Sequence, residues 1–489
     1  MAMRRLGRSG QITGLMVAII IGALLGRSGT SVDGLWIIWW AIVCAVLLMR
    51  RSRIAFAGLV WLILLIGIWR GYETIFAHSL LGKHVGHKVS LVGTLADDPG
   101  MNEYGQLEFT LNQVQLSGAE TPYSVKVRMA GYQSLRRGYR VVVTGKLAET
   151  LGIAPVRMSF AQVHVLSTDV GWLEELRGKF FMTVRMAVPE PMSGFGIGLL
   201  LGARSQMEPK LQDALSIVGL THLVAVSGYN LTIMAQAAQR VFLGISIFIA
   251  TAVTLWFLFG FLLMAGFSAS IVRASLVAVI GLGISYYGFQ AKPMTLLALP
   301  AMVTIAWNPD YLLRDLGWQL SFLAFYGVLV VAPLIEERWV KRPNMIKSLF
   351  IESTAAHIMT LPLIMWRFQT ISVIAPFSNI MVLPMVPMAM LLTFLTGIIG
   401  MVNPVLGAII GLPATGLLGL MIGSAKWFAE VPMASTNLAA NEYLVLGFYA
   451  VVVCVVWLMK RGVGSSGVRE SRLGGTILAG PDKGSGGAV

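Results

Sequence analysis

Long apolar stretches in series are the feature that most limits how this sequence can fold. Three open the chain, at about 11–26, 35–49 and 54–69, and about ten more follow between 193 and 459. A helix needs ~20 apolar residues to cross the ~30 Å hydrocarbon core of a bilayer. Charged residues make up 12% of the 489 residues, against about 25% in soluble domains. The sequence therefore predicts an α-helical polytopic membrane protein with about 10–11 spans. It excludes a soluble enzyme, a disordered chain and a coiled coil.

Arginine clusters near the first apolar stretches indicate how the chain enters the membrane. They are Arg4, Arg5 and Arg8 before the first stretch and Arg50, Arg51 and Arg53 after the second. Because cytoplasmic loops carry an excess of Lys and Arg, the N-terminus of the 1–70 membrane segment is expected in the cytoplasm. The third span then ends on the outer side. Residues 12–25 also have the character of a signal peptide, but no small-residue cleavage site follows, which favours a retained helix.

The composition changes between residues 71 and 170, where short alternating runs replace the long apolar ones. Five runs have the alternation of strands: 88–96, 106–116, 123–130, 139–147 and 158–166. Turn residues separate them and no long helical pattern intervenes, which predicts a closed β-barrel of OB type. Closure removes the exposed edges that an isolated sheet of this size would have. By the orientation argument the barrel is extracytoplasmic.

Three further segments have readable patterns. Residues 171–190 carry Phe180 and Val184 at helical spacing with charges opposite, which predicts an amphipathic helix on the membrane surface. A linker helix packed on the barrel is the alternative. The basic loop 336–347 is expected in the cytoplasm. The Gly/Ser-rich residues 461–489 predict a disordered cytoplasmic tail.

The sequence lacks the motifs of several enzyme classes. It has no GxxxxGK[ST] motif, so ATP is not hydrolysed by a P-loop. The six histidines form neither H-E-x-x-H nor H-x-H-x-D-H, which argues against a catalytic zinc. Cys44 and Cys454 each lie in an apolar run and are expected to be reduced core residues. We therefore expect no metal, no cofactor and no catalytic residue, and a protein that is not an enzyme.

Polar and ionisable residues interrupt the membrane region 191–460 in four places. Inside a bilayer such residues are costly and indicate function by default. They are His222, Ser227 and Asn230 in GLTHLVAVSGYNLTIM, Arg273 in SIVRASL, Asp315 and Gln319 in NPDYLLRDLGWQLSF, and Arg367 and Asn379 in TLPLIMWRFQTISVIAPFSNIMVLPMVP. Pro384 and Pro387 are expected to break the last segment into half-helices that face protein or a water-filled cavity.

Each group also has a purely structural interpretation. Ser227 and Gly228 are small residues of the kind that let membrane helices pack closely. The guanidinium of Arg273 is always charged, and a buried pair with Asp315 satisfies it. Asp315 has Arg314 as its other candidate partner. The residues alone leave these alternatives open.

The succession of motifs carries a family resemblance. GLLLGARS, LQDALSIVGLTHLVAVSGYN, SIVRASL, NPDYLLRDLGWQLSFLAFYG and the 360–387 segment, in that order, resemble the ComEC/Rec2 competence proteins from about Gly194 to about Pro387. That family comprises the inner-membrane channels for DNA uptake in natural transformation. The resemblance implies that this chain passes single-stranded DNA across the bacterial cytoplasmic membrane into the cytoplasm. It also implies an OB-like domain after three N-terminal spans.

The chain departs from the family pattern in two ways. Many members carry a C-terminal metallo-β-lactamase-like domain thought to degrade the non-transported strand, and no such ligand cluster follows the last span here, so a separate nuclease is expected. The family's SGLH-like motif ends in Asn230, which can hydrogen-bond but cannot act as a histidine. Because no motor motif is visible, transport is expected to need an external driver: a cytoplasmic helicase-type ATPase, strand capture or the proton gradient. The resemblance implies an extracytoplasmic DNA receptor upstream.

The implied substrate fixes what the candidate residues must do. A charge at the bilayer centre costs ~2.5–3.5 kcal/mol or more, so a strand needs a hydrated path between helices. The eight polar residues named above are the candidates for that path. On the barrel, the candidate DNA contacts are Lys126, Arg128, Tyr132, Arg136, Arg137 and Arg140, from a stretch without acidic residues. OB barrels bind single strands with cationic grooves and stacking rings, and a solvated strand face is the alternative.

Two other functions stay open at this stage. A secondary transporter of a small solute or lipid also uses broken helices as its binding site. An intramembrane hydrolase is a weaker alternative, since Ser227 and His222 are five residues apart and lie ~140° apart on an ideal helix, a poor arrangement for a nucleophile and its base.

Overall fold

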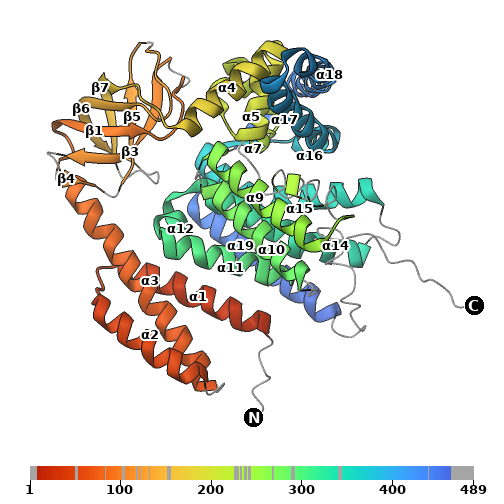
Figure 1. Cartoon of the computed structure of the whole chain (residues 1–489). Coiled ribbons are helices and arrows are strands. Elements are labelled where there is room, and N and C mark those ends of the chain that lie inside the picture. Colours follow the sequence, from red (N-terminus) through yellow and green to blue (C-terminus); the bar gives the residue numbers. More distant parts are fainter. Residues whose placement is uncertain are drawn as a thin grey trace, which may run out of the picture. The chain divides into compact units, whose positions relative to one another are not determined.

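Figure 1 shows the computed structural model of the chain, with its helices and strands labelled in sequence order. The structure describes these residues: 8–49, 53–82, 84–101, 105–116, 119–121, 123–131, 133–150, 156–224, 231, 234–235, 239, 244–266, 269–287, 292–339, 344–438 and 440–463. The chain forms two compact units. The first comprises Met1–Lys210, Ala298–Gln319 and Leu392–Thr415, and the second comprises Leu211–Leu297, Leu320–Leu391 and Gly416–Val489.

Three helices open the first unit: α1 (Arg8–Arg27), α2 (Gly34–Met49) and α3 (Arg53–Gly82). α1 and α3 pack backbone to backbone because glycines lie at their contact. A Cβ atom on Gly22 would come within 2.2 Å of the Leu64 carbonyl oxygen, and one on Gly67 within 2.7 Å of that of Ile19. Small residues allow this approach between membrane helices, where lipid supplies no hydrophobic drive for association.

The barrel follows α3 directly. Its strands are β1 (Lys88–Leu95), β2 (Gly100–Met101), β3 (Leu107–Leu116), β4 (Ala119–Glu120), β5 (Val125–Met129), β6 (Arg140–Glu149) and β7 (Val156–Ser167). β1 pairs with both β3 and β6, β6 pairs with β7, and β5 joins β7 in parallel and β3 in antiparallel register. The five long strands therefore close on themselves, and the predicted closed barrel is confirmed. Its core is built by inward residues such as Leu91, Phe109 and Val127.

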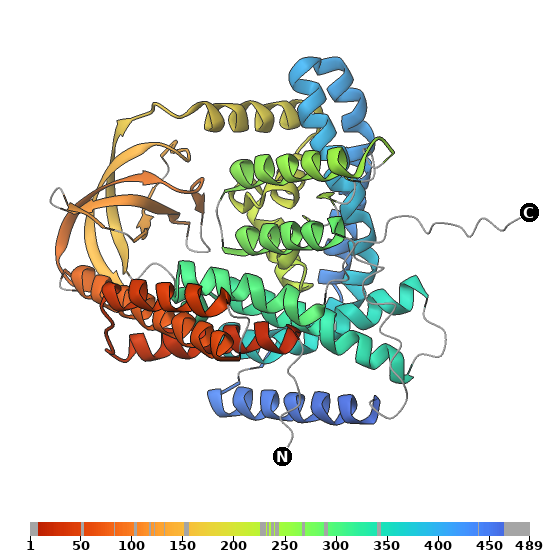
Figure 2. The same cartoon turned by 60° about the horizontal axis from the view of Figure 1, so that its bottom comes forward.

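Helix α4 (Trp172–Ala187) links the barrel to the pair formed by α17 (Val386–Val402) and α18 (Pro404–Ala429), as Figure 2 shows. Its Phe180 packs where a Cβ atom on Gly397 of α17 would come within 2.0 Å of the ring. Arg177 of α4 forms a salt bridge of 2.8 Å with Asp98, which follows β1. The buried side of α4 thus contacts protein, Met182 and Met186 stay exposed, and its position on a membrane surface stays a prediction.

Most of the second unit is helical. The remaining helices of the chain are α5 (Met192–Leu201), α6 (Pro209–Ile217), α7 (Thr221–Val224), α9 (Ile247–Ala265), α10 (Ala269–Tyr286), α11 (Pro293–Trp307), α12 (Asp310–Arg314), α13 (Leu316–Tyr326), α14 (Ala332–Trp339), α15 (Met345–Phe368), α16 (Ala375–Val382) and α19 (Glu442–Val463). A π-helical turn, Gly327–Val331, joins α13 to α14. A two-stranded ribbon of β8 (Thr370–Ser372) and β9 (Ser435–Asn437) follows α15 and α18.

Eight helical segments among the described residues are long and apolar enough to cross a membrane, and four shorter apolar helices accompany them. The chain is therefore a multi-pass membrane protein. In the run 373–400, where prolines are predicted to interrupt the helix, a 3₁₀ turn at Leu383–Met385 separates α16 from α17, and the cavity that such half-helices would face stays a prediction. Pro384 lies in that turn and Pro387 follows it, and a proline removes a backbone donor from the helical ladder.

A buried ion pair ties α1 to the start of α12 within the first unit. Arg27 donates to Asp310, whose side chain is fully buried. Arg70 of α3 donates from Nε to the Ala306 carbonyl oxygen at 3.0 Å, at the end of α11. Tyr123, before β5, donates to the Thr74 carbonyl oxygen of α3 at 3.3 Å. Burial, and after it the charge of Asp310, raises the pKa of Tyr123 to about 12.

We predict that Asp310→Asn lowers the thermal-unfolding temperature of the purified protein in detergent. Removing one partner of a buried ion pair leaves the other charge uncompensated, which costs ~3–5 kcal/mol. The matched control is Asp33→Asn, which removes an exposed carboxylate in the α1–α2 connection. Equal unfolding temperatures for the two variants would show that the pair does not hold α12 to α1.

Candidate functional site

The turn after α6 docks onto the start of α16 in the second unit. Ser378 Oγ donates hydrogen bonds to the carbonyl oxygens of Val218 at 2.8 Å and of Ala375 at 3.0 Å. Gly219 has φ +73°, and a Cβ atom there would lie 2.6 Å from that of Ala375. Any side chain at position 219 would force the two segments apart. The structure thus places Gly219, at the start of the 219–234 group, against the 360–387 segment, and residues 225–230 of that group lie outside the described residues.

Polar atoms without hydrogen-bond partners line the contact of α15 with the 372–379 segment. Asn379 is 7% exposed, and its Nδ2 donates to Ser353 Oγ at 3.0 Å. Within the described part of the chain, Asn379 Oδ1, Thr354 Oγ1 and Ser372 Oγ are buried and have no partner. A buried polar atom without a partner costs several kcal/mol in hydrocarbon. Water or a passing polar group is therefore expected at this contact, which we call the α15–α16 seam.

The two arginines of the predicted path, one buried and one half-buried, contact aromatic rings. Arg273 of α10 is 3% exposed, and its guanidinium carbon lies 5.4 Å from the ring centroid of Phe322 in α13. Arg367, in the last turn of α15, stacks on Trp366 at 4.2 Å. The Arg367 Nε atom is buried and makes no hydrogen bond to another described residue. A guanidinium is always charged and is attracted to the face of an aromatic ring.

Three other predicted path residues have local partners. Asp315 Oδ1 accepts from the Trp318 backbone N–H at 3.1 Å, which caps α13. Gln319 Nε2 donates to the Leu312 carbonyl oxygen at 2.8 Å. His222 Nδ1 lies 2.9 Å from the Gly219 carbonyl oxygen. These contacts explain the helix start at 316 and the turn at 219, and the role of these residues in a path stays a prediction. Ser227 and Asn230 lie outside the described residues.

The predicted cations of β5 have acidic partners from another strand. Glu108 of β3 forms salt bridges with Lys126 and, at 2.5 Å, with Arg128. Burial raises the pKa of Glu108, but hydrogen bonds and charges from the two cations outweigh it, so the pKa lies below its ordinary value. The carboxylate form, and with it the pairing, is therefore complete above the ordinary pKa and is lost only as the pH falls through the lowered one. At neutral pH both cations are partly neutralised.

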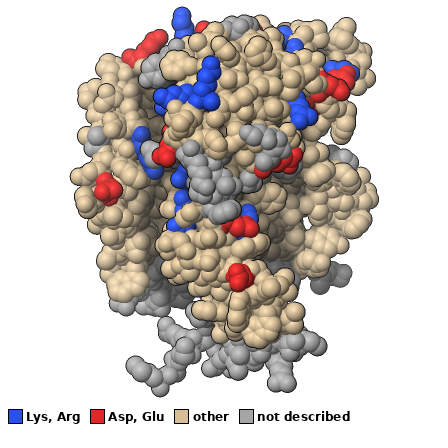
Figure 3. All heavy atoms as spheres, turned by 90° about the vertical axis from the view of Figure 1, so that its left-hand side faces the viewer, with Lys and Arg blue, Asp and Glu red and all other residues tan. Residues whose placement is uncertain are grey.

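The predicted cations of the 132–140 loop differ in their surroundings. Arg137 forms a 3.0 Å salt bridge with Glu174 of α4, and burial lowers its pKa. Arg136 and Arg140 are exposed, and no salt bridge within the described residues involves them. Tyr132 lies outside the described residues. In Figure 3, cations and carboxylates lie side by side over the barrel, and the lower part of that face carries few charges.

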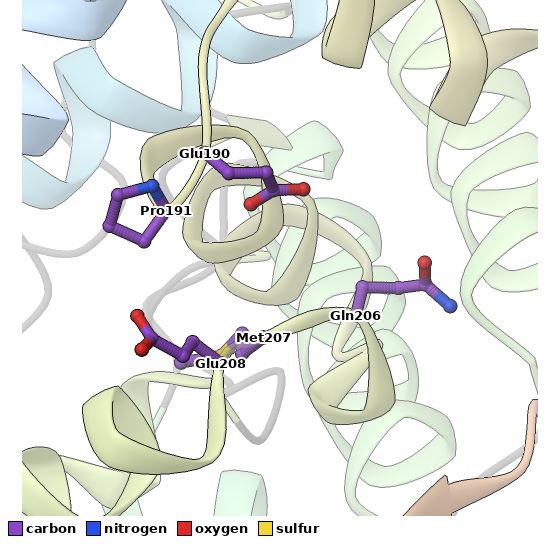
Figure 4. Close-up of a pocket in the computed structure, with 5 residues that line it drawn as sticks. All are labelled: Glu190, Pro191, Gln206, Met207 and Glu208. Carbon is purple, nitrogen blue, oxygen red and sulfur yellow. The ribbon is translucent and has the colours of Figure 1, made fainter.

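Two shallow pockets occur in the first unit. One of about 410 Å³ is lined by Glu190, Pro191, Gln206, Met207 and Glu208 (Figure 4). Arg185 donates to Gln206 at 2.8 Å and pairs with Glu190 at 3.3 Å, so this pocket is braced by its own charges. The other, about 250 Å³, lies on the barrel and includes Asp97, Glu108 and Lys126. Within the described residues no cluster of His, Cys, Asp or Glu is arranged to hold a metal.

Comparison with known proteins decides the family. The sequence model of a family described as "Competence protein" matches residues 199–462, more than half of the chain. This chain belongs to the competence protein family. It is a member of ComEC/Rec2 type. The matched residues include the Gly219 turn, Arg273 and the α15–α16 seam.

One curated relative adds to this. The chain is 26% identical over 211 residues to ComE operon protein 3 of Bacillus subtilis (strain 168). The match covers 43% of this chain and 26% of that relative, so the chain spans about a quarter of the relative's length. No solved structure matches the chain.

Sequence reasoning missed the residues that complete both sites. Glu108 and Glu174 lie far along the chain from the cations they neutralise, so a count of charges within residues 121–148 could not find them. Ser353 and Thr354 are ordinary polar residues near the start of a long helix. Only the packing of α16 against α15 turns them into part of the seam.

We predict that Glu108→Gln strengthens the binding of a polyanion to the barrel. The variant frees Lys126 and Arg128, and each cation that reaches a phosphate of a single strand adds ~0.7 to the slope of log affinity against log salt. The measurement is fluorescence anisotropy of a labelled oligothymidylate on the full-length protein in nanodiscs, titrated with salt at pH 7.

The matched control is Glu120→Gln, which removes the same charge from an exposed residue that accepts only from Gln115, at 3.3 Å. If both variants raise the affinity equally, the increase comes from net charge alone. The claim that Glu108 specifically keeps Lys126 and Arg128 from binding a polyanion is then wrong.

Proposed function

We propose that this chain is a channel that passes single-stranded DNA into the cytoplasm during natural transformation. The observation that carries the proposal is the α15–α16 seam, buried polar atoms without partners inside a region that matches the competence family. A sealed apolar bundle gains nothing from burying polar atoms without partners, such as Asn379 Oδ1, Thr354 Oγ1 and Ser372 Oγ. A hydrated path for a polyanion does.

Two cations of the matched region suit the same task. Arg273 and Arg367 keep their charge whatever their surroundings, and each has a ring beside it. A strand that carries one charge per nucleotide crosses the membrane only where water or such cations offset the cost of leaving solvent. We assign these two residues to the lining of the path, with Asn379 as a neutral hydrogen-bonding partner.

The membrane orientation in the proposal follows from the helix order. With the N-terminus in the cytoplasm, α3 ends on the outer side and the barrel is extracytoplasmic. The β8–β9 ribbon supports the number of membrane crossings in this topology. Residues 370–372 and 435–437 pair, so they must lie on the same side of the membrane. Two crossings separate them, α16 with α17 and then α18, as that pairing requires.

We assign the barrel to the OB type. Around the barrel the long strands follow the order β1, β3, β5, β7, β6 and back to β1, with β5 and β7 parallel. A five-stranded Greek-key barrel is the architecture that OB folds use for oligonucleotides. The partners that follow from the proposal are single-stranded DNA, membrane lipid, an extracytoplasmic DNA receptor, a separate nuclease and a cytoplasmic helicase-type ATPase.

One observation favours a second candidate function. The broken helix of α16, the 3₁₀ turn and α17 is the kind of element that secondary transporters use to bind a small solute. A deletion strain that takes up labelled DNA normally would favour that candidate. Loss of uptake with an intact surface DNA-binding step supports the channel.

We predict that Asn379→Leu lowers transformation frequency at least tenfold with unchanged protein abundance in the membrane. Leucine keeps the branched shape and the number of heavy atoms, and it removes the polar atoms that are proposed to hold water in the seam. Asn379→Ser places a hydroxyl there, which keeps a polar group at the seam, and is expected to retain most activity. Transformation assays and immunoblots of membrane fractions measure both.

The control for loss of a buried polar group is Thr396→Val in α17. The Thr396 hydroxyl bonds only to the Leu392 carbonyl oxygen of its own helix, at 2.7 Å, so transformation is expected to stay normal. Normal transformation in Asn379→Leu as well would remove the seam from the path.

A further inference from the structure

Phe160 of β7 is placed in a way that packing does not explain. It is 83% exposed and has φ +53°. A bulky residue at positive φ is an outlier, and such strain persists where the surroundings impose it. A phenylalanine on the outside of a barrel gives up the burial that would stabilise it. Both features therefore need a reason.

A β-bulge turns Phe160 outward. Opposite β6, Thr144 pairs with Gln162 and Lys146 with Ser159, so Phe160 and Ala161 together face the single residue Gly145. Val156 and Met158 point inward before the bulge, and Ala161 and Val163 after it. Without the extra residue Phe160 would point into the core. Bulges of this kind re-aim side chains beside functional sites.

Two lysines lie on the neighbouring strands β6 and β1, close in register to Phe160. Lys88 of β1 is the register partner of Lys146 of β6, which in turn faces Ser159, the neighbour of Phe160. Both lysines are exposed, and no salt bridge within the described residues involves either. Like charges directly opposite each other on a sheet destabilise it. An anion bound between them removes that repulsion.

The same face continues along the strands without an acidic residue. The outward residues of β1, β6 and β7 that carry hydrogen-bonding, cationic or aromatic groups form what we call the β1–β6–β7 strip. They are Lys88, Ser90, Thr94, Arg140, Thr144, Lys146, Arg157, Ser159, Phe160, Gln162 and His164. From Lys146 to Arg140 the strip measures ~20 Å at ~3.3 Å per residue. Glu149, at the end of β6, lies beyond it.

The strip differs from the β3–β5 face in how its cations are used. On that face Lys126 and Arg128 share the carboxylate of Glu108. On the strip the lysines have no such partner among the described residues, and a ring stands beside them. Surfaces that bind single strands combine cations that have no salt-bridge partner with exposed aromatic rings.

We propose that the β1–β6–β7 strip is the surface on which the barrel holds single-stranded DNA, with a base stacked on Phe160 and phosphates on Lys88 and Lys146. The inference rests on the proposed function and adds the contact surface to it. A linear polyanion fits better than a lipid headgroup because cations occur at both ends of the strip. A membrane surface would reach only the end that adjoins α3.

The test measures the affinity of a labelled oligothymidylate for the full-length protein in nanodiscs, by anisotropy over a range of salt. Phe160→Ala is expected to weaken binding ~5- to 100-fold, the range for loss of one stacked base, and Phe160→Trp to restore it. The double variant Lys88→Ser with Lys146→Ser is expected to lower the salt slope by ~1.4. Circular dichroism and elution volume establish that the variants are folded.

Controls remove the same groups elsewhere. Trp172→Ala takes away a ring of α4 that is 72% exposed, and Lys210→Ser with Lys426→Ser removes two exposed lysines outside the barrel. Both are expected to bind like the wild type. A photo-reactive phenylalanine analogue at position 160 is expected to cross-link to the oligonucleotide.

The outcomes separate this inference from the proposed function. Wild-type binding that the strip variants leave unchanged overturns the strip and leaves the channel standing. Cross-linking of position 160 to lipid alone also overturns it, in favour of a membrane contact. If the wild type does not bind the oligonucleotide and its deletion leaves transformation normal, both proposals are wrong. If the wild type does not bind the oligonucleotide but its deletion abolishes transformation, the strip proposal is wrong and the channel proposal stands.

Discussion

A polar atom at membrane depth must find its partner in protein or in water, and this constraint governs the structure more than any single contact. Along most helices side-chain hydroxyls meet it by bonding to their own backbone, as Thr254 and Thr396 do. At the α15–α16 seam Asn379, Thr354 and Ser372 do not. Because lipid offers no alternative, we expect water at the seam when the protein is in a membrane, and we propose the seam as part of the path for a strand.

Charge in the barrel serves two different ends. Arg137 and Arg177 connect the barrel to α4 through Glu174 and Asp98, while Tyr123 connects it to α3. The barrel is therefore braced by two helices that come from different parts of the chain. The cations used in this bracing are not available to a ligand. The lysines of the β1–β6–β7 strip form no salt bridge with another described residue, so a local excess of basic residues does not by itself tell which cations are free to bind a ligand.

The membrane class, the five strands and the proline break could be predicted because each is written in local periodicity or in a single backbone property. The pairing of Lys126 with Glu108 and the contact of Asn379 with Ser353 could not, since each joins strands or helices that only the fold brings together. The outward position of Phe160 could not be predicted for another reason. Alternation predicts it to be inward, and a one-residue bulge reverses that side. The eight path candidates were chosen because polar residues are costly in a bilayer. The structure gives some of them a local role instead, such as Asp315, which caps α13.

The most direct measurement of the central claim is water access to the seam. In a background with Cys44 and Cys454 replaced by alanine, Asn379→Cys is reacted with a membrane-impermeant maleimide, with Met433→Cys, a position that is 78% exposed, as the labelling standard. The account predicts that position 379 is labelled and that a single-stranded oligonucleotide slows the reaction there but not at position 433. A cysteine at 379 that stays unreactive while 433 is fully labelled would contradict it.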